Sequence, residues 1–366
     1  MILLEEHPQV GVPSHCSGVV SLNGLKLLGL EASPVYTQRV INGARFYPPN
    51  GEPVEVRKQE PVALVINRMK LDQFLAKKAI AGGTELRTNA RASKFFRQED
   101  SARITLQNME EIACKIVIDA SGAGSRLPEQ AGLQTPDWSQ LLPGLQYELD
   151  GTSQQGDMVE LFFGNHVAPG FFAWSIPTGD RSARVGLASR KANVKKLLDG
   201  LVNDHWPKAV IETTKSGSVL VSGPIGRCWA PNFLVAGDAA GQVKQTTGGG
   251  IVIGGFCGQL AGKAAASFAI SKDEQALGFL QEYDRKWKEL FEADLRGMNL
   301  ARKVFASLTD DTLNHAFGAL GNHLEEIEEL GDMDFQGRVI TQMLSKKELV
   351  KLLPRVAVDS IKSLFS

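Results

Sequence analysis

The segment "GDAAG", residues 237–241, carries an acid placed where it could bind a large cofactor. It directly follows the apolar run at residues 233–236, which is typical of a buried parallel strand. Asp238, at the carboxyl end of this strand, can accept hydrogen bonds from ligand hydroxyl groups, while its small neighbours let a cofactor approach the backbone. The alternative is an aspartate that only caps the next helix.

A second glycine-rich segment, "TTGGGI", follows within a few residues. Gly248, Gly249 and Gly250 stand in front of Ile251, where a helix of small apolar residues is predicted to begin. N–H groups at a helix start suit a phosphate or a flavin carbonyl. A flexible loop is the alternative, but it does not predict the helix that follows. The two segments together favour a cofactor site.

Two further charged residues fit the same interpretation. The apolar run at residues 2–4 ends in Glu5, and in dinucleotide-binding folds an acid at the end of the second strand binds a ribose about 20 residues after a glycine fingerprint. Here the acid is present and the fingerprint is not. Arg68 stands where a strand-like run enters a predicted helix, so its guanidinium could reach cofactor oxygens. An exposed surface arginine is the alternative.

Other residues could act on a substrate. Cys16 lies in the loop that leaves the first apolar run, where a buried, inert cysteine is the alternative. Phe171, Phe172 and Trp174 fall in a strand-like segment and could line a long apolar ligand. Ordinary sheet core explains the same pattern, and the pattern alone favours that explanation.

Composition limits the class of protein. The 366 residues, 43% of them hydrophobic, can bury a large core, and the length indicates two or three domains at about 150 residues each. A net charge of -1 lacks the basic excess that nucleic acids require. The four cysteines lie far apart without a C-x-x-C pair, so we expect neither a metal site nor disulfides, and a reducing cytoplasm fits. No apolar run approaches the roughly 18 residues of a spanning helix.

The order of patterns predicts the architecture. Three apolar runs, each meeting small residues before a helix-like stretch, indicate an α/β nucleotide-binding domain; they start near residues 2, 115 and 232. Asn50-Gly51 between two strand-like runs predicts a hairpin, and residues 159–189 alternate as an antiparallel sheet would. The chain becomes charged and helical from about Glu274. This order is common among flavoproteins.

With these motifs in place, the chain resembles the geranylgeranyl reductase family of FAD-dependent oxidoreductases, in particular the archaeal enzymes that saturate isoprenoid chains of membrane lipids. The resemblance runs from Leu3 to about Leu313. The motifs that carry it, in order, are "GVPSHCSG", "INRMKLDQFL", "IDASGAGS", "LQYEL", "APGFFAWSIPTG", "FLVAGDAAGQVKQTTGGGI" and "LTDDTLN".

The resemblance implies a Rossmann-like FAD-binding fold of the glutathione-reductase and aromatic-hydroxylase type, with an inserted antiparallel β-sheet domain and C-terminal helices. The implied FAD-binding domain is discontinuous and comprises residues 1–30, 66–135 and 221–272. Residues 31–65 and 136–220 form the implied substrate domain. Residues 273–366 form the implied C-terminal helical region.

The resemblance also implies roles for individual residues. The implied cofactor-binding residues are Glu5, His15, Cys16, Arg68, Gly122, Asp238, Gly248, Gly249, Gly250 and Ile251. Phe172, Trp174 and Pro177 are the implied substrate contacts. Cys16, near flavin and substrate, and Gly249 and Gly250, beside the isoalloxazine ring, are the implied catalytic positions.

The chain departs from the family in ways that affect these expectations. The family begins with a strand and a GxGxxG helix ahead of the position of Glu5, and about 30 residues of that type, a βα unit, are absent here. We therefore expect a truncated gene model or fragment, and weak retention of FAD by this chain alone. Ser121 stands where many relatives have aspartate, and Phe172 replaces the more usual tyrosine.

The activity that the resemblance implies is flavin-dependent reduction of double bonds in geranylgeranyl chains of lipid precursors. It requires an external electron donor, with ferredoxin, NAD(P)H and a deazaflavin as the alternatives. Residues 345–366 mix basic and apolar side chains and are the best candidate for peripheral docking on the inner face of the cell membrane; packing on the protein body is the alternative. A flavin-dependent monooxygenase or halogenase and a non-catalytic prenyl-lipid carrier remain alternative functions.

Overall fold

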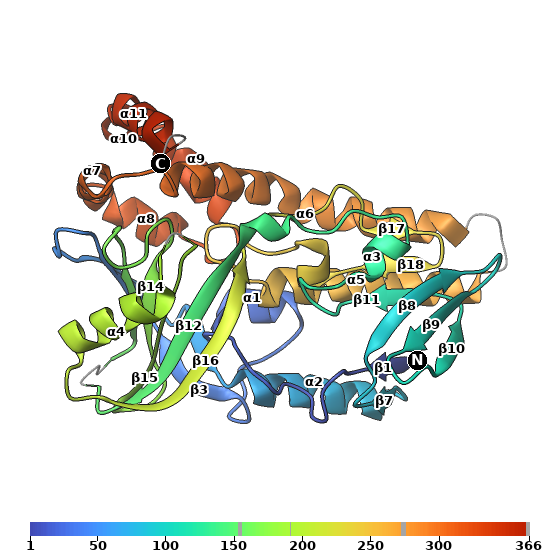
Figure 1. The fold of residues 1–366 in the computed structure, drawn as a ribbon. Helices are drawn as coiled ribbons and strands as arrows, with labels where there is room; N and C mark the ends of the chain where they lie inside the picture. The colour runs from blue at the N-terminus through green and yellow to red at the C-terminus, as the bar shows by residue number, and fades with distance from the viewer. Residues whose placement is uncertain (153–155, 191, 272–275, 364–366) are drawn as a thin grey trace. The chain divides into compact units, whose positions relative to one another are not determined.

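The computed structural model describes residues 1–366 except 153–155, 191, 272–275 and 364–366, and it divides into two units (Figure 1). Unit 1 comprises Met1–Ser14, Arg68–Gln140 and Leu220–Leu295, and unit 2 comprises His15–Asn67, Leu141–Val219 and Arg296–Ser366. This division differs from the expected boundaries by more than five residues in two places. Residues 15–30 belong to unit 2, and the C-terminal helical region is shared, because helix α6 (Ala276–Phe305) runs from one unit into the other.

Unit 1 contains the parallel strands of the predicted nucleotide-binding domain. β1 (Ile2–Leu4) pairs with β7 (Glu85–Arg87), and β11 (Val117–Asp119) pairs with β18 (Phe233–Val235), both in parallel. β17 (Trp229–Ala230) extends the second pair as an antiparallel edge. All three residues of β18 are fully buried, which explains its continuous apolar sequence.

A three-stranded antiparallel sheet lies in the same unit. It consists of β8 (Ala92–Arg97), β9 (Ala102–Leu106) and β10 (Glu111–Cys114). The Phe95 ring of β8 meets the edge of the Phe233 ring, with 4.8 Å between centroids, so this sheet packs against β18.

Helix α5 (Ile251–Ile270) corrects one expectation from the sequence. It is long and apolar enough to cross a membrane by length and composition, although no such run was expected. A core helix of a globular unit meets the same criterion. Within unit 1, α5 contacts β11 and β18, beside which it lies in Figure 1. It also contacts the one-turn helix η2 (Gly237–Ala240), and Cys257 is fully buried. The buried residues of α5, which include Val252 and Ile253, pack within unit 1.

Unit 2 is built on a seven-stranded sheet. Its strands, in spatial order, are β16 (Val210–Leu220), β12 (Leu141–Asp150), β15 (Ser182–Ala188), β14 (Ala173–Pro177), β13 (Met158–Phe162), β4 (Gly43–Tyr47) and β5 (Val54–Arg57). β4 and β5 pair in antiparallel register around Asn50-Gly51, which confirms the predicted hairpin.

The two faces of this sheet differ in character because side chains alternate along each strand. One face packs its apolar residues, such as Tyr147 and Val185, against Leu198 of helix α4 (Val194–His205). The other face carries Gln146, Glu148 and Arg184 on β12 and β15. The sequence alternation thus separates an apolar core from a polar face.

A second sheet of unit 2 comprises β2 (Val19–Ser21), β6 (Ala63–Ile66) and β3 (Thr37–Ile41). Its Ile41 and Val65 pack with Ile176 of β14.

Short helices complete unit 2. They are α1 (Leu22–Leu27), α7 (Asp310–Gly321), α8 (Leu324–Leu330), α9 (Gln336–Leu344), α10 (Lys347–Val350) and α11 (Leu353–Ser363). α2 (Arg68–Ala81) and α3 (Leu127–Gln130) belong to unit 1. Pro354 occupies the first turn of α11, where a helix needs no N–H donor, and the break between α10 and α11 lies just before it.

Candidate active site

Asp238 provides an available hydrogen-bond acceptor in unit 1. It lies in η2, directly after β18, with its side chain exposed. Protein atoms nevertheless surround the carboxyl closely enough to raise its pKa by desolvation, and the positive charge of Arg68 opposes that rise. Arg68 is the first residue of α2. The structure therefore brings two of the predicted cofactor-binding residues within electrostatic range of each other.

The triple-glycine segment forms a closed loop in front of α5. The N–H of Gly248 donates to the carbonyl of Lys244 at 2.7 Å, and the N–H of Gly249 donates to Thr247 Oγ1 at 3.3 Å. Two of the three glycine donors that were expected to bind the cofactor are thus used within the loop. The N–H of Gly250 and those of the first turn of α5 remain for a ligand.

Gly250 connects this loop to Asp238. A Cβ at Gly250 would lie 2.8 Å from Asp238 Oδ1 and 3.1 Å from Val243 Cγ1, so any side chain would crowd the carboxylate. Ile251 follows and begins α5. The free carboxylate, the helix start and the small residues therefore converge, and this arrangement fits a cofactor that carries hydroxyl and carbonyl groups.

Asp119 was not among the predicted site residues, although it ends β11 as Asp238 follows β18. Its buried carboxylate accepts hydrogen bonds from Ser121 N at 3.0 Å, Ser121 Oγ at 2.6 Å and Ser125 Oγ at 2.6 Å. These bonds hold the loop that contains Gly122, which has a φ of +91° and open space where a Cβ would lie. The sequence signal that could have identified Asp119 is an acid at a strand end followed by serine residues.

Glu5 is already partly engaged. Its Oε1 accepts from the backbone N–H of His7 at 2.9 Å and lies 2.8 Å from His7 Nδ1. Only the second carboxylate oxygen is open to a ribose. A ligand at this position would therefore meet the Glu5 and His7 side chains together.

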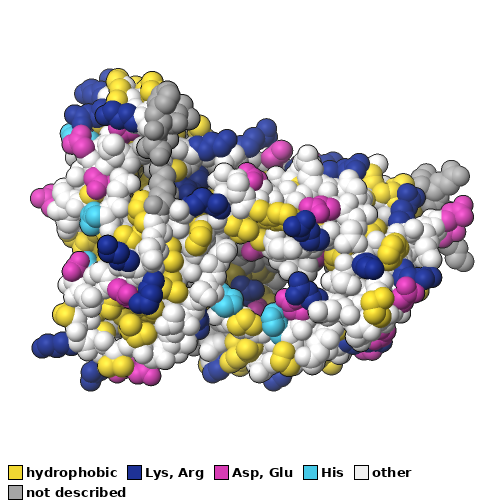
Figure 2. Space-filling view, in the orientation of Figure 1, with side chains coloured by type: hydrophobic (Ala, Val, Ile, Leu, Met, Phe, Trp, Pro, Cys, Tyr) yellow, Lys and Arg dark blue, Asp and Glu magenta, His cyan; other side chains and the backbone are white. Residues whose placement is uncertain are grey.

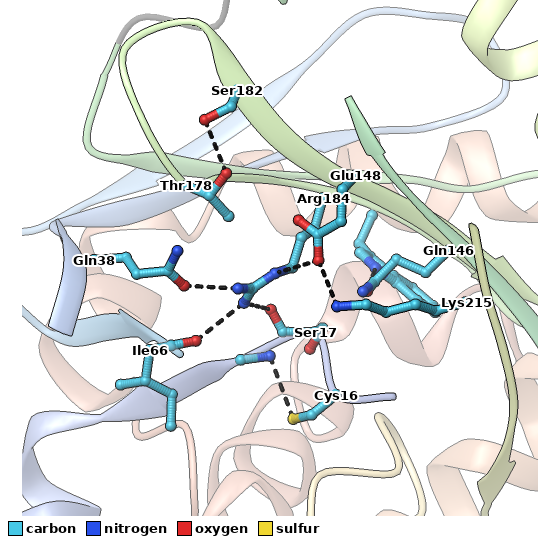
Figure 3. Close-up of polar contacts among 12 residues, drawn as sticks. Cys16, Ser17, Gln38, Ile66, Gln146, Glu148, Thr178, Ser182, Arg184 and Lys215 are labelled. Atoms are coloured by element: carbon cyan, nitrogen blue, oxygen red, sulfur yellow. Dashed lines mark hydrogen bonds and ion pairs between the residues drawn. The ribbon is translucent and has the colours of Figure 1, made fainter. Parts of the chain in front are cut away.

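In unit 2, the loop before β2 carries His15, Cys16 and Ser17. Figure 3 shows Cys16 and Ser17. The N–H of Gly18 donates to Cys16 Sγ at 3.3 Å, which turns the half-buried thiol back onto its own loop. His15 is exposed and lies against Gly217 of β16, where a Cβ would come within 3.3 Å of the His15 Cβ.

Arg184 connects this loop to the sheet, a role that the sequence did not indicate. Its Nη1 donates to the carbonyls of Ser17 at 2.9 Å and Ile66 at 3.0 Å, and its Nη2 donates to Gln38 Oε1 at 2.6 Å. The guanidinium thus ties the Cys16 loop to β6 and to β3, as Figure 3 shows.

The carboxylate of Glu148 compensates this buried positive charge and is shared with Lys215. Glu148 Oε1 accepts from Arg184 Nε at 3.1 Å and from Lys215 Nζ at 2.9 Å. A Cβ at Gly18 would lie 2.6 Å from the Ile66 carbonyl and would also strike Arg184, so only glycine fits there. The network is satisfied and rigid, as a buried ion pair must be to be tolerated.

The predicted aromatic contacts are partly brought together. Trp174 Nε1 donates to Gln146 Oε1 at 3.1 Å, and the Trp174 ring lies 6.1 Å from that of Phe172. A Cβ at Gly186 would lie 2.6 Å from Trp174 Cζ2, so the indole covers this glycine. Pro177 is three residues beyond Trp174 on β14 and therefore points to the opposite face of the sheet. The structure does not join Pro177 to the other two.

The aromatic surface is larger than the sequence indicated. We call it the aromatic wall, and it comprises Phe46, Phe163, Phe171, Phe172, Trp174, Phe305 and Phe317, whose neighbouring rings lie 4.3–6.4 Å apart. All except Phe171 are partly exposed. Four of the seven come from segments without an aromatic motif, so no local pattern could have identified them.

Comparison with known proteins identifies the family to which this chain is similar. The family model described as tryptophan halogenase matches residues 31–293. The chain is 31% identical to the digeranylgeranylglycerophospholipid reductase of Methanocaldococcus jannaschii, over 93% of this chain and 88% of that one. It is 30% identical to digeranylgeranylglycerophospholipid reductase 2 of Methanopyrus kandleri, over 95% of this chain and 90% of that one.

Solved structures show the same fold. A geranylgeranyl bacteriochlorophyll reductase-like protein from Thermoplasma acidophilum superposes with a TM-score of 0.84 at 25% identity, covering 97% of this chain and 92% of its own. The flavin-dependent halogenase CmlS superposes with a TM-score of 0.69 at 16% identity, covering 100% of this chain and 73% of its own. The expected α/β flavoprotein fold is therefore confirmed.

Proposed function

This chain belongs to the digeranylgeranylglycerophospholipid reductase family of FAD-dependent oxidoreductases, and from that premise we propose that it reduces carbon–carbon double bonds in geranylgeranyl chains of isoprenoid glycerophospholipids. The observation that carries the proposal is an identity of 30–31% with enzymes of that name across 93% and 95% of the chain. The halogenases share the fold at 16% identity, and a shared fold does not transfer their activity.

The cofactor is FAD, and the geometry of unit 1 suits it. Asp238 offers a free carboxylate to ribityl or ribose hydroxyls, and the first turn of α5 offers N–H groups to a flavin carbonyl or a phosphate. When bound and reduced, FAD supplies the hydride that adds to one carbon of the double bond, while a proton adds to its neighbour. An external donor must then return two electrons.

The residues of unit 2 suit an isoprenoid substrate. The aromatic wall offers partly exposed rings to a long hydrocarbon chain, and apolar contact there excludes water from the double bond. In this proposal, the thiol of Cys16 lies near the reacting carbons and is the group that transfers the proton. Arg184 holds the backbone next to that thiol.

Mass spectrometry of the lipid product tests the proposal. The full chain, supplied with FAD and a chemical reductant, should add mass to digeranylgeranylglyceryl phosphate in steps of two hydrogens. Loss of these steps in the Asp238→Ala variant would connect the reaction to the cofactor site. Oxygen-dependent hydroxylation without a change in saturation would favour the monooxygenase, and lipid binding without any reaction would favour the carrier.

A lipid substrate requires a docking surface, and we propose that helix α11 binds an anionic membrane. Leu353, Val358 and Ile361 are 56%, 50% and 59% exposed and lie on one outward arc of the helix. Figure 2 shows hydrophobic and basic side chains gathered where α10 and α11 lie. Leu364 and Phe365, which were part of the expected apolar face, lie outside the described residues.

The other side of α11 is bonded to the protein. Asp359 accepts hydrogen bonds from Thr309 N at 3.0 Å and Thr309 Oγ1 at 2.9 Å, and Ser360 Oγ lies 3.0 Å from Ser307 Oγ. Val356 lies on this side too and is partly buried. Polar contacts therefore anchor the helix, while Leu353, Val358 and Ile361 face outward.

Basic side chains give the apolar arc an electrostatic preference. Lys351 and Lys362 are exposed near its two ends and complement anionic headgroups. An amphipathic helix of this kind lies in the plane of the interface with its apolar side in the acyl boundary. Both properties point to a membrane and not to an apolar protein surface.

Sedimentation with vesicles tests the docking. The Val358→Glu/Ile361→Glu double variant should partition onto phosphatidylglycerol vesicles at least about tenfold less, because each buried CH₂ contributes about 0.8 kcal/mol. Val210→Glu is the matched control, since Val210 is 58% exposed on β16 of the same unit. An equal effect of both substitutions, or binding that ignores salt and lipid charge, would remove α11 from the docking surface.

A further inference from the structure

Arg302 is a charged side chain at the edge of the aromatic wall, and it forms no salt bridge with the residues that the structure describes. It lies on α6, one turn before Phe305, so both side chains project from the same side of the helix. Its guanidinium lies 5.3 Å from the centroid of the Phe171 ring, which stacks on Phe172 at 4.3 Å. A positive charge therefore adjoins a continuous hydrocarbon-binding surface.

The guanidinium is only partly satisfied. Nε and Nη1 of Arg302 are buried and have no hydrogen-bond partner in the described chain, while the side chain as a whole is partly exposed. No described carboxylate forms a salt bridge with it. Burial lowers its pKa to about 10, so the group is still charged at neutral pH.

Such an arrangement is costly unless a ligand completes it. A buried donor without a partner loses its hydration and gains nothing in return, and a cation–π contact with one ring recovers only part of that loss. The other buried cation of this unit, Arg184, has four hydrogen-bond acceptors, which shows what full compensation requires. The charge of Arg302 is not compensated by any carboxylate of the described residues, so an anionic ligand would complete it.

We propose that Arg302 binds the phosphate of an amphipathic lipid whose apolar chains lie on the aromatic wall. The inference rests on the proposed function. It adds that the phosphate is the part of the substrate that Arg302 recognises. A guanidinium forms short, charge-assisted hydrogen bonds with phosphate oxygens, and it can form two in parallel. The neighbouring rings accept the hydrocarbon. Together they select a phosphate ester attached to apolar chains.

Two lipids supply that chemistry, a glycerophospholipid and a free prenyl diphosphate. Binding of the full chain, with FAD present in excess, should be measured by calorimetry with digeranylgeranylglyceryl phosphate, with geranylgeranyl diphosphate and with the neutral digeranylgeranylglycerol. Wild-type protein should prefer a phosphorylated lipid over the neutral one by about tenfold or more, since a hydrogen bond to a charged group contributes about 1.5–3 kcal/mol. The phosphorylated lipid that binds more tightly than the neutral lipid is the one whose phosphate Arg302 recognises.

The Arg302→Met variant should remove this preference and leave neutral-lipid affinity within about twofold, and Arg302→Lys should restore part of it. Arg338→Met is the matched control, because Arg338 lies 5.0 Å from the Phe335 ring but is exposed. Equal losses for phosphorylated and neutral lipids would show that Arg302 only packs, and would overturn the inference. Wild-type protein that binds all lipids equally would overturn it too, with the proposed reduction intact. Failure to bind or reduce any of them would instead overturn the proposed function.

Discussion

The Nη1 of Arg184 donates a hydrogen bond of 2.9 Å to the backbone carbonyl of Ser17, the residue next to Cys16. The two residues are 167 positions apart in the chain. The same guanidinium bonds the carbonyl of Ile66, so one buried charge joins β15, β6 and the Cys16 loop within unit 2. The position of the thiol thus depends on a residue of the seven-stranded sheet.

Replacing Arg184 by glutamine should disorder the Cys16 loop. The substitution removes charge-assisted bonds to two carbonyls and leaves Glu148 with Lys215 alone, so we expect a loss of about 2–3 kcal/mol in unfolding free energy. The rate at which a thiol reagent modifies Cys16 should rise, which urea denaturation and mass spectrometry can follow separately.

Arg39→Gln is the control for Arg184, since Arg39 pairs with the exposed Asp180 on the surface of the same unit. It should leave both measurements almost unchanged, because exposed ion pairs contribute little. If Cys16 in the Arg184→Gln variant keeps the wild-type modification rate, Arg184 stabilises the fold without positioning the thiol.

Asp238→Asn should stabilise the protein without cofactor at neutral pH and weaken FAD binding. Since the pKa of Asp238 is raised by folding, its contribution to stability is present below the unfolded pKa of about 4 and is lost as pH rises through the folded pKa. The variant lacks this loss, so its melting temperature should exceed that of wild type at pH 7 and match it near pH 3. FAD affinity should fall about tenfold. A variant that melts below wild type at pH 7 would contradict the assignment.

Gly250→Ala should harm the cofactor site. The new Cβ would crowd Asp238 Oδ1 and Val243, at a cost of about 1–3 kcal/mol, and it would displace the carboxylate that receives FAD. Gly258→Ala in the same helix meets open space and should stabilise by about 0.5–1 kcal/mol. Flavin fluorescence and thermal melting distinguish the two variants, and similar behaviour of both would exclude the predicted crowding.

Cys16→Ala tests the role of the thiol. We expect prenyl reduction to fall by about 100-fold or more, the lower end of the range for a lost proton-transfer group, with FAD affinity within about twofold of wild type. Cys114, a partly exposed thiol on β10 of unit 1, provides the control through Cys114→Ala. Full activity of the Cys16→Ala variant would show that another group donates the proton.

Several features of this protein follow from short stretches of sequence. The buried strand β18 with Asp238 behind it, the hairpin around Asn50-Gly51 and the helix that begins at Ile251 each depend on a local period or a turn residue. Hydrophobic alternation and turn chemistry act over a few residues, so one sequence is enough to predict them. The motifs at these positions also carried the resemblance to the reductase family.

The partners of these residues were decided by the tertiary structure alone. Arg184 meets Ser17, and Arg302 meets Phe171, only because strands and helices far apart in the chain are packed into one unit. Pro177 was grouped with Trp174 from the sequence, but the pleat of β14 turns it to the other face. Side-chain direction and long-range pairing depend on how elements pack, and no local pattern encodes which distant residue completes a buried charge.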